Sequence, residues 1–402
     1  MWIIIGIFMV VAGAVNAQTV CDDRPLADWY LQGADRYERT SVRVLTTNGG
    51  RLDWGTDGVV YFDRRPGLVL NEYDIWKMDI ETGEETCLTC DHPDLEGKSG
   101  ASRGQPELSP NADWMIFQAE HPNHALTSDP NATQPGKGIY NNLWAMNLKT
   151  GKADLVYEVS DGKWLRPKGG TLHPQWSHDG RQIVWGDLQN LCIGCGVIGN
   201  WQIRTAEFWV IETVPVQAVL LDHELFNPFI QGNGHWYETH DWGRNGELVL
   251  YSGNTMGQLE LFSDINYNTL EQLREGCEPI RLTETSGRNG EPWEFDEHAH
   301  FTQKHDAISW LRAEIGVDRG ELWMMNPDGS GKRQITFFNT PGSEEYMLTG
   351  GEFEANVPSD HAWNPMPTSG KAQLAVFVQI DFQLMQNEAP INYIYLLEFD
   401  LN

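Results

Sequence analysis

A short phrase built around one anchor residue recurs six times along the chain, and a β-rich stretch follows it each time. The most complete copy reads Pro174-Gln175-Trp176-Ser177-His178-Asp179-Gly180, a turn sequence that precedes a strand. The six anchors are Trp54, Leu108, Trp176, Trp242, Phe301 and Trp363. Repeats of this size, made of strands and turns, indicate a β-propeller in which each copy forms one blade.

The two ends of the chain complement each other as parts of one blade. The last repeat reaches residue 402 without an outer strand, whereas residues 41–46 resemble an outer strand that lacks its three inner partners. Pairing these segments would remove an open sheet edge. We therefore predict an all-β fold over residues 41–402, namely a six-bladed β-propeller of four-stranded blades that is closed by an N-terminal outer strand.

The N-terminal 40 residues differ from the repeats. Residues 2–15 are apolar and lead into Val15-Asn16-Ala17, a small-residue cleavage pattern, so we predict a signal peptide over residues 1–17. A membrane anchor is the alternative, but the run is short for a span. Residues 18–40 are assigned to an N-terminal extension. The mature chain, without a membrane span, is expected to be exported to the periplasm or the medium.

Cysteine content and charge narrow the environment and the partners. Six cysteines in an exported chain indicate disulfides, although the pairs Cys87/Cys90 and Cys192/Cys195 leave a zinc site open as an alternative. The net charge of −29 disfavours binding to nucleic acid and to anionic lipid. We expect a monomer that presents its loop face to a glycan or a protein.

Histidines lie just before four of the six anchors. Side chains alternate along a strand, and equivalent positions of the blades surround one axis, so these histidines are expected to meet at the channel. Neutral imidazoles with a carboxylate suit a divalent transition metal. The predicted metal ligands are His240, His298, His300 and His361, and the candidate carboxylates are Glu238, Asp241, Glu297 and Asp360. The alternative is that each histidine packs at its blade and binds neighbouring backbone.

The repeat resembles that of the TolB-type propellers, on the phrase 174–180 quoted above. The starts Thr239-His240-Asp241-Trp242 and Glu297-His298-Ala299-His300-Phe301 also resemble those of the oligogalacturonate lyases in the same propeller group. That resemblance implies manganese in the central channel, held by histidines at positions 240, 298 and 300 and by a Gln that the sequence does not place.

Several long loops carry aromatic and cationic residues that suit a sugar acid. The candidate substrate-binding residues are Trp164, Arg166, Trp201, Trp236 and Trp293. Loop anchoring is the alternative role for these rings.

Two functions follow as hypotheses. The first is a metal-dependent lyase that acts on uronate-containing oligosaccharides, with His173, His235 or Tyr237 as the catalytic base. The second is a scaffold or binding module without catalysis.

Overall fold

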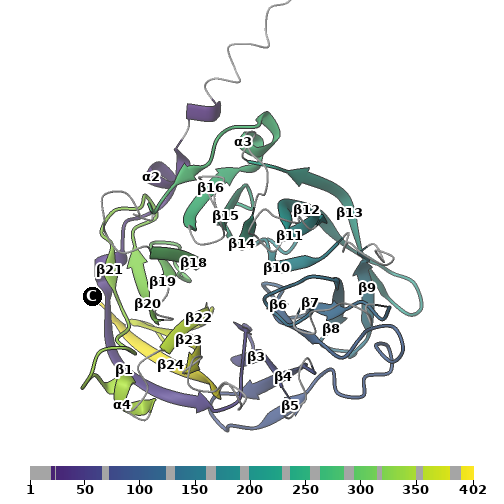
Figure 1. Ribbon diagram of the computed structural model, residues 1–402, viewed down its shortest axis with the longest axis horizontal. Coiled ribbons are helices and arrows are strands. Elements are labelled where there is room, and N and C mark those ends of the chain that lie inside the picture. The colour runs from purple at the N-terminus through teal and green to yellow at the C-terminus, as the bar shows by residue number, and fades with distance from the viewer. Residues whose placement is uncertain are drawn as a thin grey trace, which may run out of the picture.

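A computed structural model describes residues 20–22, 24–65, 72–123, 132–159, 169–190, 199–228, 236–253, 263–284, 294–314, 319–349, 356–380 and 391–402. Six antiparallel sheets of four strands stand in a ring around a common centre (Figure 1). The prediction of a six-bladed propeller is confirmed. None of the helices in the described ranges is long and apolar enough to span a membrane.

The blades follow the order of the chain, and the innermost strand of each comes first. Blade 1 contains β2 (Leu52–Trp54), β3 (Val59–Arg64), β4 (Asp74–Asp79) and β5 (Glu85–Cys87). Blade 2 contains β6 (Arg103–Leu108), β7 (Trp114–Glu120), β8 (Asn141–Asn147) and β9 (Ala153–Tyr157). Blade 3 contains β10 (Thr171–Trp176), β11 (Gln182–Asn190), β12 (Asn200–Ile211) and β13 (Gln217–Phe226).

The second half of the ring repeats this order. Blade 4 contains β14 (Tyr237–Trp242), β15 (Leu248–Gly253), β16 (Asp264–Thr269) and β17 (Ile280–Arg281). Blade 5 contains β18 (Glu294–Phe301), β19 (Ile308–Glu314), β20 (Arg319–Met325) and β21 (Arg333–Gln334). Blade 6 contains β22 (Asn356–Trp363), β23 (Lys371–Ile380), β24 (Ile391–Leu401) and the N-terminal β1 (Tyr37–Thr46). The short helices are α2 (Pro25–Trp29), η1 (Ala34–Arg36), α3 (Leu270–Glu275) and α4 (Glu344–Leu348).

The N-terminal strand closes the ring as predicted. Strand β1 pairs antiparallel with β24, from Tyr37 opposite Leu401 to Thr46 opposite Ile394. It begins at residue 37 rather than 41. Tyr37 is buried, and its hydroxyl donates a hydrogen bond to Asp306 Oδ1 at 2.6 Å, which anchors the start of the strand on blade 5.

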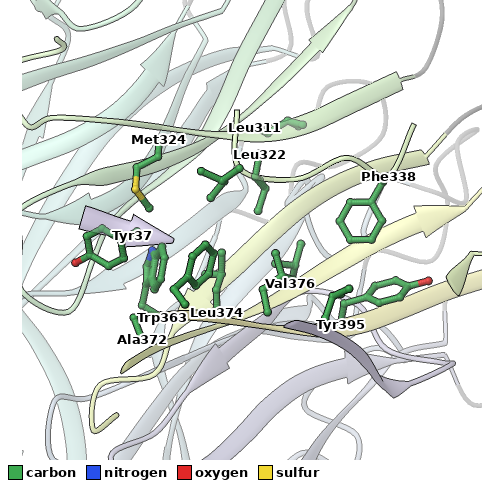
Figure 2. Packing of buried hydrophobic residues seen from close by; sticks show 14 of the residues in the cluster. Tyr37, Leu311, Leu322, Met324, Phe338, Trp363, Ala372, Leu374, Val376 and Tyr395 are labelled. Carbon is green, nitrogen blue, oxygen red and sulfur yellow. The ribbon is translucent and has the colours of Figure 1, made fainter. Parts of the chain in front are cut away.

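Apolar residues are buried between neighbouring blades rather than in one central core. In β23, Leu374, Val376 and Val378 pack toward blade 5, whereas Ala375 and Phe377 pack toward blade 1. Successive side chains of a strand point to opposite faces, so a strand that is covered on both faces has a continuous apolar sequence. Figure 2 shows the packing between blades 5 and 6, where Tyr37 from β1 lies beside Trp363.

Two disulfides lie in the described part of the chain. Cys21 is bonded to Cys277, which ties the N-terminal extension to blade 4, and Cys87 is bonded to Cys90. The bond between Cys87 and Cys90 removes these thiolates from the zinc alternative. Cys192 and Cys195 lie outside the described residues, as does the predicted signal peptide.

Breaking the long-range disulfide should lower stability far more than breaking the short one. Cys21 and Cys277 are 256 residues apart, against three residues for Cys87 and Cys90. Because a cross-link restricts the unfolded chain more when it closes a longer loop, we expect Cys277→Ser to cost roughly 2–5 kcal/mol. Thermal unfolding beside Cys87→Ser as the control checks this. Equal melting temperatures for the two variants would contradict it.

Candidate metal centre

The innermost strands of five blades are interrupted at equivalent places near the axis. Pairing with the second strand skips at least one residue in β6, β10, β14, β18 and β22. The skipped residues include Gln105, His173, His240, His298 and Asp360. A β-bulge of this kind turns a side chain out of the regular alternation.

The backbone at three of these bulges is left-handed. Gln105, His173 and His298 have φ values of 49°, 45° and 50°. Positive φ is uncommon for residues other than glycine and often marks a functional position. The bulges therefore aim one polar side chain per blade toward the centre of the ring, where the innermost strands face one another in Figure 1.

Four buried side chains from blades 3, 4 and 5 converge at this centre. His173, Glu238, His240 and His298 each offer one ligand atom, and these atoms all lie within 4.8 Å of one another. The side chains are buried in the protein interior. The ring of His173 lies 5.7 Å from that of His240 and 5.1 Å from that of His298, between centroids. Three imidazoles and one carboxylate are a donor set that suits a divalent transition metal.

A second layer of charged groups orients the imidazoles. Asp360 Oδ1 lies 3.2 Å from His298 Nδ1 and 3.6 Å from His173 Nδ1, and the Nε2 atom of His173 contacts Glu238. Arg51 Nε lies 3.4 Å from the other oxygen of Asp360. A carboxylate at Nδ1 directs Nε2 of the same ring toward the centre, as is usual around metal-binding histidines.

His240 is held by different partners. Its Nε2 lies 2.7 Å from Ser252 Oγ and accepts the backbone N–H of His298 at 3.2 Å. Its Nδ1 is buried and makes no hydrogen bond within the described residues. A buried polar atom without a partner is costly, so such an atom beside three other ligands fits a bound cation.

Burial and neighbouring charges determine the protonation states of Asp360, His298 and His240. Burial opposes ionisation of Asp360, but His298, His173 and Arg51 together outweigh it and hold the pKa of Asp360 well below its usual value. Burial lowers the pKa of His298, yet Asp360 and Glu238 together raise it, and the net shift is upward. Burial and the nearby His298 keep the pKa of His240 well below its usual value, which leaves that imidazole neutral and able to bind a metal.

Two of the predicted ligands lie outside the four-residue group. Both nitrogens of His361 are in use, with Nε2 2.7 Å from Ser309 Oγ and Nδ1 3.0 Å from the carbonyl of Ser359. The ring of His300 lies 4.9 Å from that of His361 and 6.3 Å from that of His240. The structure thus brings His240 and His298 together with His173, which was predicted as a base, and with the candidate carboxylate Glu238.

The other predicted residues are divided between the cavity, the core and the segments outside the described ranges. Trp201 and Trp236 are buried and line a cavity of about 190 Å³ beside the metal group, together with Phe295 and Glu297. Tyr237 packs in the apolar cluster between blades 3 and 4, and its hydroxyl donates to Asn227 Oδ1 at 3.2 Å. Outside the described residues lie His235, Trp164, Arg166 and Trp293.

The sequence carried a signal for residues that the histidine pattern missed. Arg51 and Gln105 precede their anchors by three residues, as His173, His298 and Asp360 do. Gln105 is buried, its Oε1 accepts the backbone N–H of His173 at 3.1 Å, and its Nε2 makes no hydrogen bond to a described residue. Selecting the residue three positions before each anchor, whatever its type, would have identified both Arg51 and Gln105.

Comparison with known proteins bears on the fold. No family model matches the chain, and no curated protein matches it. Among solved structures, TolB from Acinetobacter baumannii is 9% identical with a TM-score of 0.44, and the match covers 89% of this chain and 64% of that one. The putative TolB from Agrobacterium tumefaciens is 13% identical over 82% of this chain and 90% of that one, with a TM-score of 0.44.

A third similar structure is an oligogalacturonate lyase in complex with manganese. It is 12% identical with a TM-score of 0.46, and the match covers 91% of this chain and 95% of that one. The expected neighbours, TolB-type and oligogalacturonate lyase propellers, are thus among the similar structures. The function is therefore argued from the site itself.

Proposed function

We propose that the centre of the ring binds a divalent transition metal and that the chain is a metal-dependent lyase for uronate-containing oligosaccharides. One observation carries the metal site: His173, Glu238, His240 and His298 bring four ligand atoms within 4.8 Å in the protein interior. Manganese is the metal favoured by the resemblance of the repeat starts, and that resemblance also supplies the reaction class.

The residues around the cavity have clear tasks in such a reaction. A bound metal would neutralise the uronate carboxylate and stabilise the enolate that develops beside it. Asp360 lies beside Nδ1 of both His298 and His173 and holds their rings in fixed orientations. Glu297 lines the cavity and can accept the proton from carbon five as the carbon four–oxygen bond breaks. The electrons of the broken C–H bond form the double bond, and the oxygen leaves with the departing sugar.

Export is part of this proposal. Disulfides form and persist in oxidising compartments, and the structure has Cys21 bonded to Cys277 and Cys87 bonded to Cys90. Both bonds support the predicted destination of periplasm or medium.

Elemental analysis of the purified protein tests the metal site. We expect about one equivalent of a divalent transition metal, and almost none in the double variant His240→Ala/His298→Ala, because the remaining two ligands hold a metal weakly. His223→Ala is the control, since that histidine lies on the outer strand β13. A protein that binds no metal even after reconstitution would contradict the proposal and favour the scaffold or binding module.

An activity assay then tests the reaction class. The metal-loaded protein should convert oligogalacturonate into products with an unsaturated terminal sugar, detected by ultraviolet absorbance. Chelation should stop the reaction and added metal should restore it. Full metal occupancy without unsaturated product from any uronate oligomer would reject the lyase reaction while leaving the metal site.

A further inference from the structure

We propose that Arg51 and Lys137 bind the carboxylate of a monosaccharide-sized acid in the cavity beside the metal group, and that Gly136 positions Arg51 for this task. The sugar-acid class rests on the proposed function, whereas the assignment of these residues rests on the cavity itself. All three line the cavity of about 190 Å³ that also borders His173, Glu238 and His298.

Arg51 contacts one carboxylate, and its guanidinium keeps N–H groups available for a ligand. Its Nε lies 3.4 Å from Asp360 Oδ2, and its side chain is 24% exposed. The guanidinium donates no hydrogen bond to a described residue, its buried Nε included, and its Cζ lies 6.0 Å from the centroid of the Phe377 ring. The planar guanidinium presents paired N–H groups that match the two oxygens of a carboxylate.

Gly136 leaves room for this guanidinium. Its φ is +82°, and a Cβ atom there would lie 2.0 Å from Arg51 Nη2 and 2.2 Å from Arg51 Cζ. A side chain at position 136 would therefore displace Arg51, and the backbone conformation also favours glycine. Gly136 thus leaves free the space that the Arg51 guanidinium occupies.

Lys137 adds a second positive charge next to Arg51. The chain has 28 lysines and arginines against 57 acidic residues, so cations are scarce. Other partly buried arginines contact carboxylates closely, for example Arg64 with Glu85 at 2.6 Å and Arg312 with Asp296 at 2.8 Å. The ammonium of Lys137 has no ion-pair partner in the described ranges. Two cations that remain available at one cavity of an acidic protein fit an anionic ligand.

The rest of the lining suits the body of a sugar rather than a free inorganic anion. Trp201, Trp236 and Phe295 border the same cavity, and the rings of Trp236 and Phe295 are nearly parallel at 6.4 Å. Aromatic faces stack on the apolar faces of sugar rings. The cavity is smaller than the roughly 300–1,000 Å³ of a drug-sized site, so it accommodates one small ring.

Binding of D-galacturonate and D-galactose, measured by calorimetry, tests the proposal because the two sugars differ only in the carboxylate. We expect wild-type protein to bind galacturonate at least about tenfold more tightly than galactose, since charge-assisted hydrogen bonds discriminate by this order. Arg51→Gln/Lys137→Gln should reduce galacturonate affinity to the level of galactose. Gly136→Ala should weaken galacturonate binding in the same direction while leaving galactose binding unchanged.

Matched controls separate this result from loss of folding or of metal. Lys149→Gln/Arg181→Gln removes two exposed positive charges elsewhere and should leave the preference intact. Each protein is measured with metal and after chelation, and its metal content is determined separately. A protein that binds no metal even after reconstitution, yet still prefers galacturonate through Arg51 and Lys137, would reject the metal proposal and keep this one. Equal affinity for the two sugars, or a preference that survives in Arg51→Gln/Lys137→Gln, would overturn it.

Discussion

Removing residues 1–46 should abolish the soluble, cooperatively folded protein. This deletion removes β1, and the edge of β24 loses its partner along residues 394–401. It also removes Tyr37 and Val42 from the cluster between blades 5 and 6 (Figure 2). A long, unpaired edge strand is a site of aggregation, and blade 6 would lose its outermost strand.

Contacts from η1 and β1 to blade 5 and to α4 add to the loss of stability. Arg333 donates to the carbonyl of Ala34 at 3.0 Å and also contacts the carbonyl of Tyr37, and Arg39 contacts the buried Glu345. Deleting residues 1–46 leaves the buried carboxylate of Glu345 without this cation, which is destabilising by about 3–5 kcal/mol for a buried pair. The lost apolar burial adds to this cost, against a stability of about 5–15 kcal/mol that is typical of a folded domain.

A shorter deletion is the control for this prediction. Removing residues 1–33 together with Cys277→Ser keeps β1 intact and avoids an unpaired thiol. We expect this protein to remain folded with a lowered melting temperature, whereas the deletion of 1–46 should aggregate in size-exclusion chromatography. A monomeric 1–46 deletion that unfolds at the wild-type temperature would show that β1 does not stabilise the ring.

The repeat made the architecture predictable because each blade has its own recognisable turn and strand pattern in the sequence. Turn phrases such as Ser177-His178-Asp179-Gly180 define where one strand ends, and Gly180 takes the positive φ of 71° that this turn requires. Closure was also predictable, since the last blade lacked a strand that residues 41–46 could supply. The start of β1 was missed because Tyr37 is held by Asp306, which is distant in the sequence.

The site was less predictable because it depends on bulges. Regular alternation expects His298 and His300 on the same side of their strand. Pairing of β18 with β19 instead skips from Glu297 to His300, and His298 adopts a left-handed backbone. The bulge joins His298 to the metal group and leaves His300 beside His361. The position of a β-bulge cannot be read from a local sequence pattern. Comparing equivalent positions of different blades therefore predicts the site residues better than the alternation of side chains along a single strand.

Replacing Asp360 with asparagine should weaken both metal binding and stability. The carboxylate lies 3.2 Å from His298 Nδ1 and 3.4 Å from Arg51 Nε, and it is buried. Asparagine keeps the shape but removes the charge, so Arg51 loses its counter-ion and His298 loses the group that fixes its ring. Loss of such an outer partner typically reduces metal affinity about 10- to 100-fold, and breaking a buried ion pair costs about 3–5 kcal/mol.

A matched variant separates the two effects of this substitution. Asp187 is also buried and pairs with Arg204 at 2.6 Å, but its described hydrogen-bond partners, Tyr157, Gln189 and Arg204, all lie outside the metal group. Asp187→Asn should therefore lower the melting temperature to a similar extent and leave metal affinity unchanged. Competition with a chelator of known affinity measures the second quantity. If Asp360→Asn retained wild-type metal affinity, Asp360 would be a structural partner of Arg51 alone, and His298 would need no carboxylate to act as a ligand.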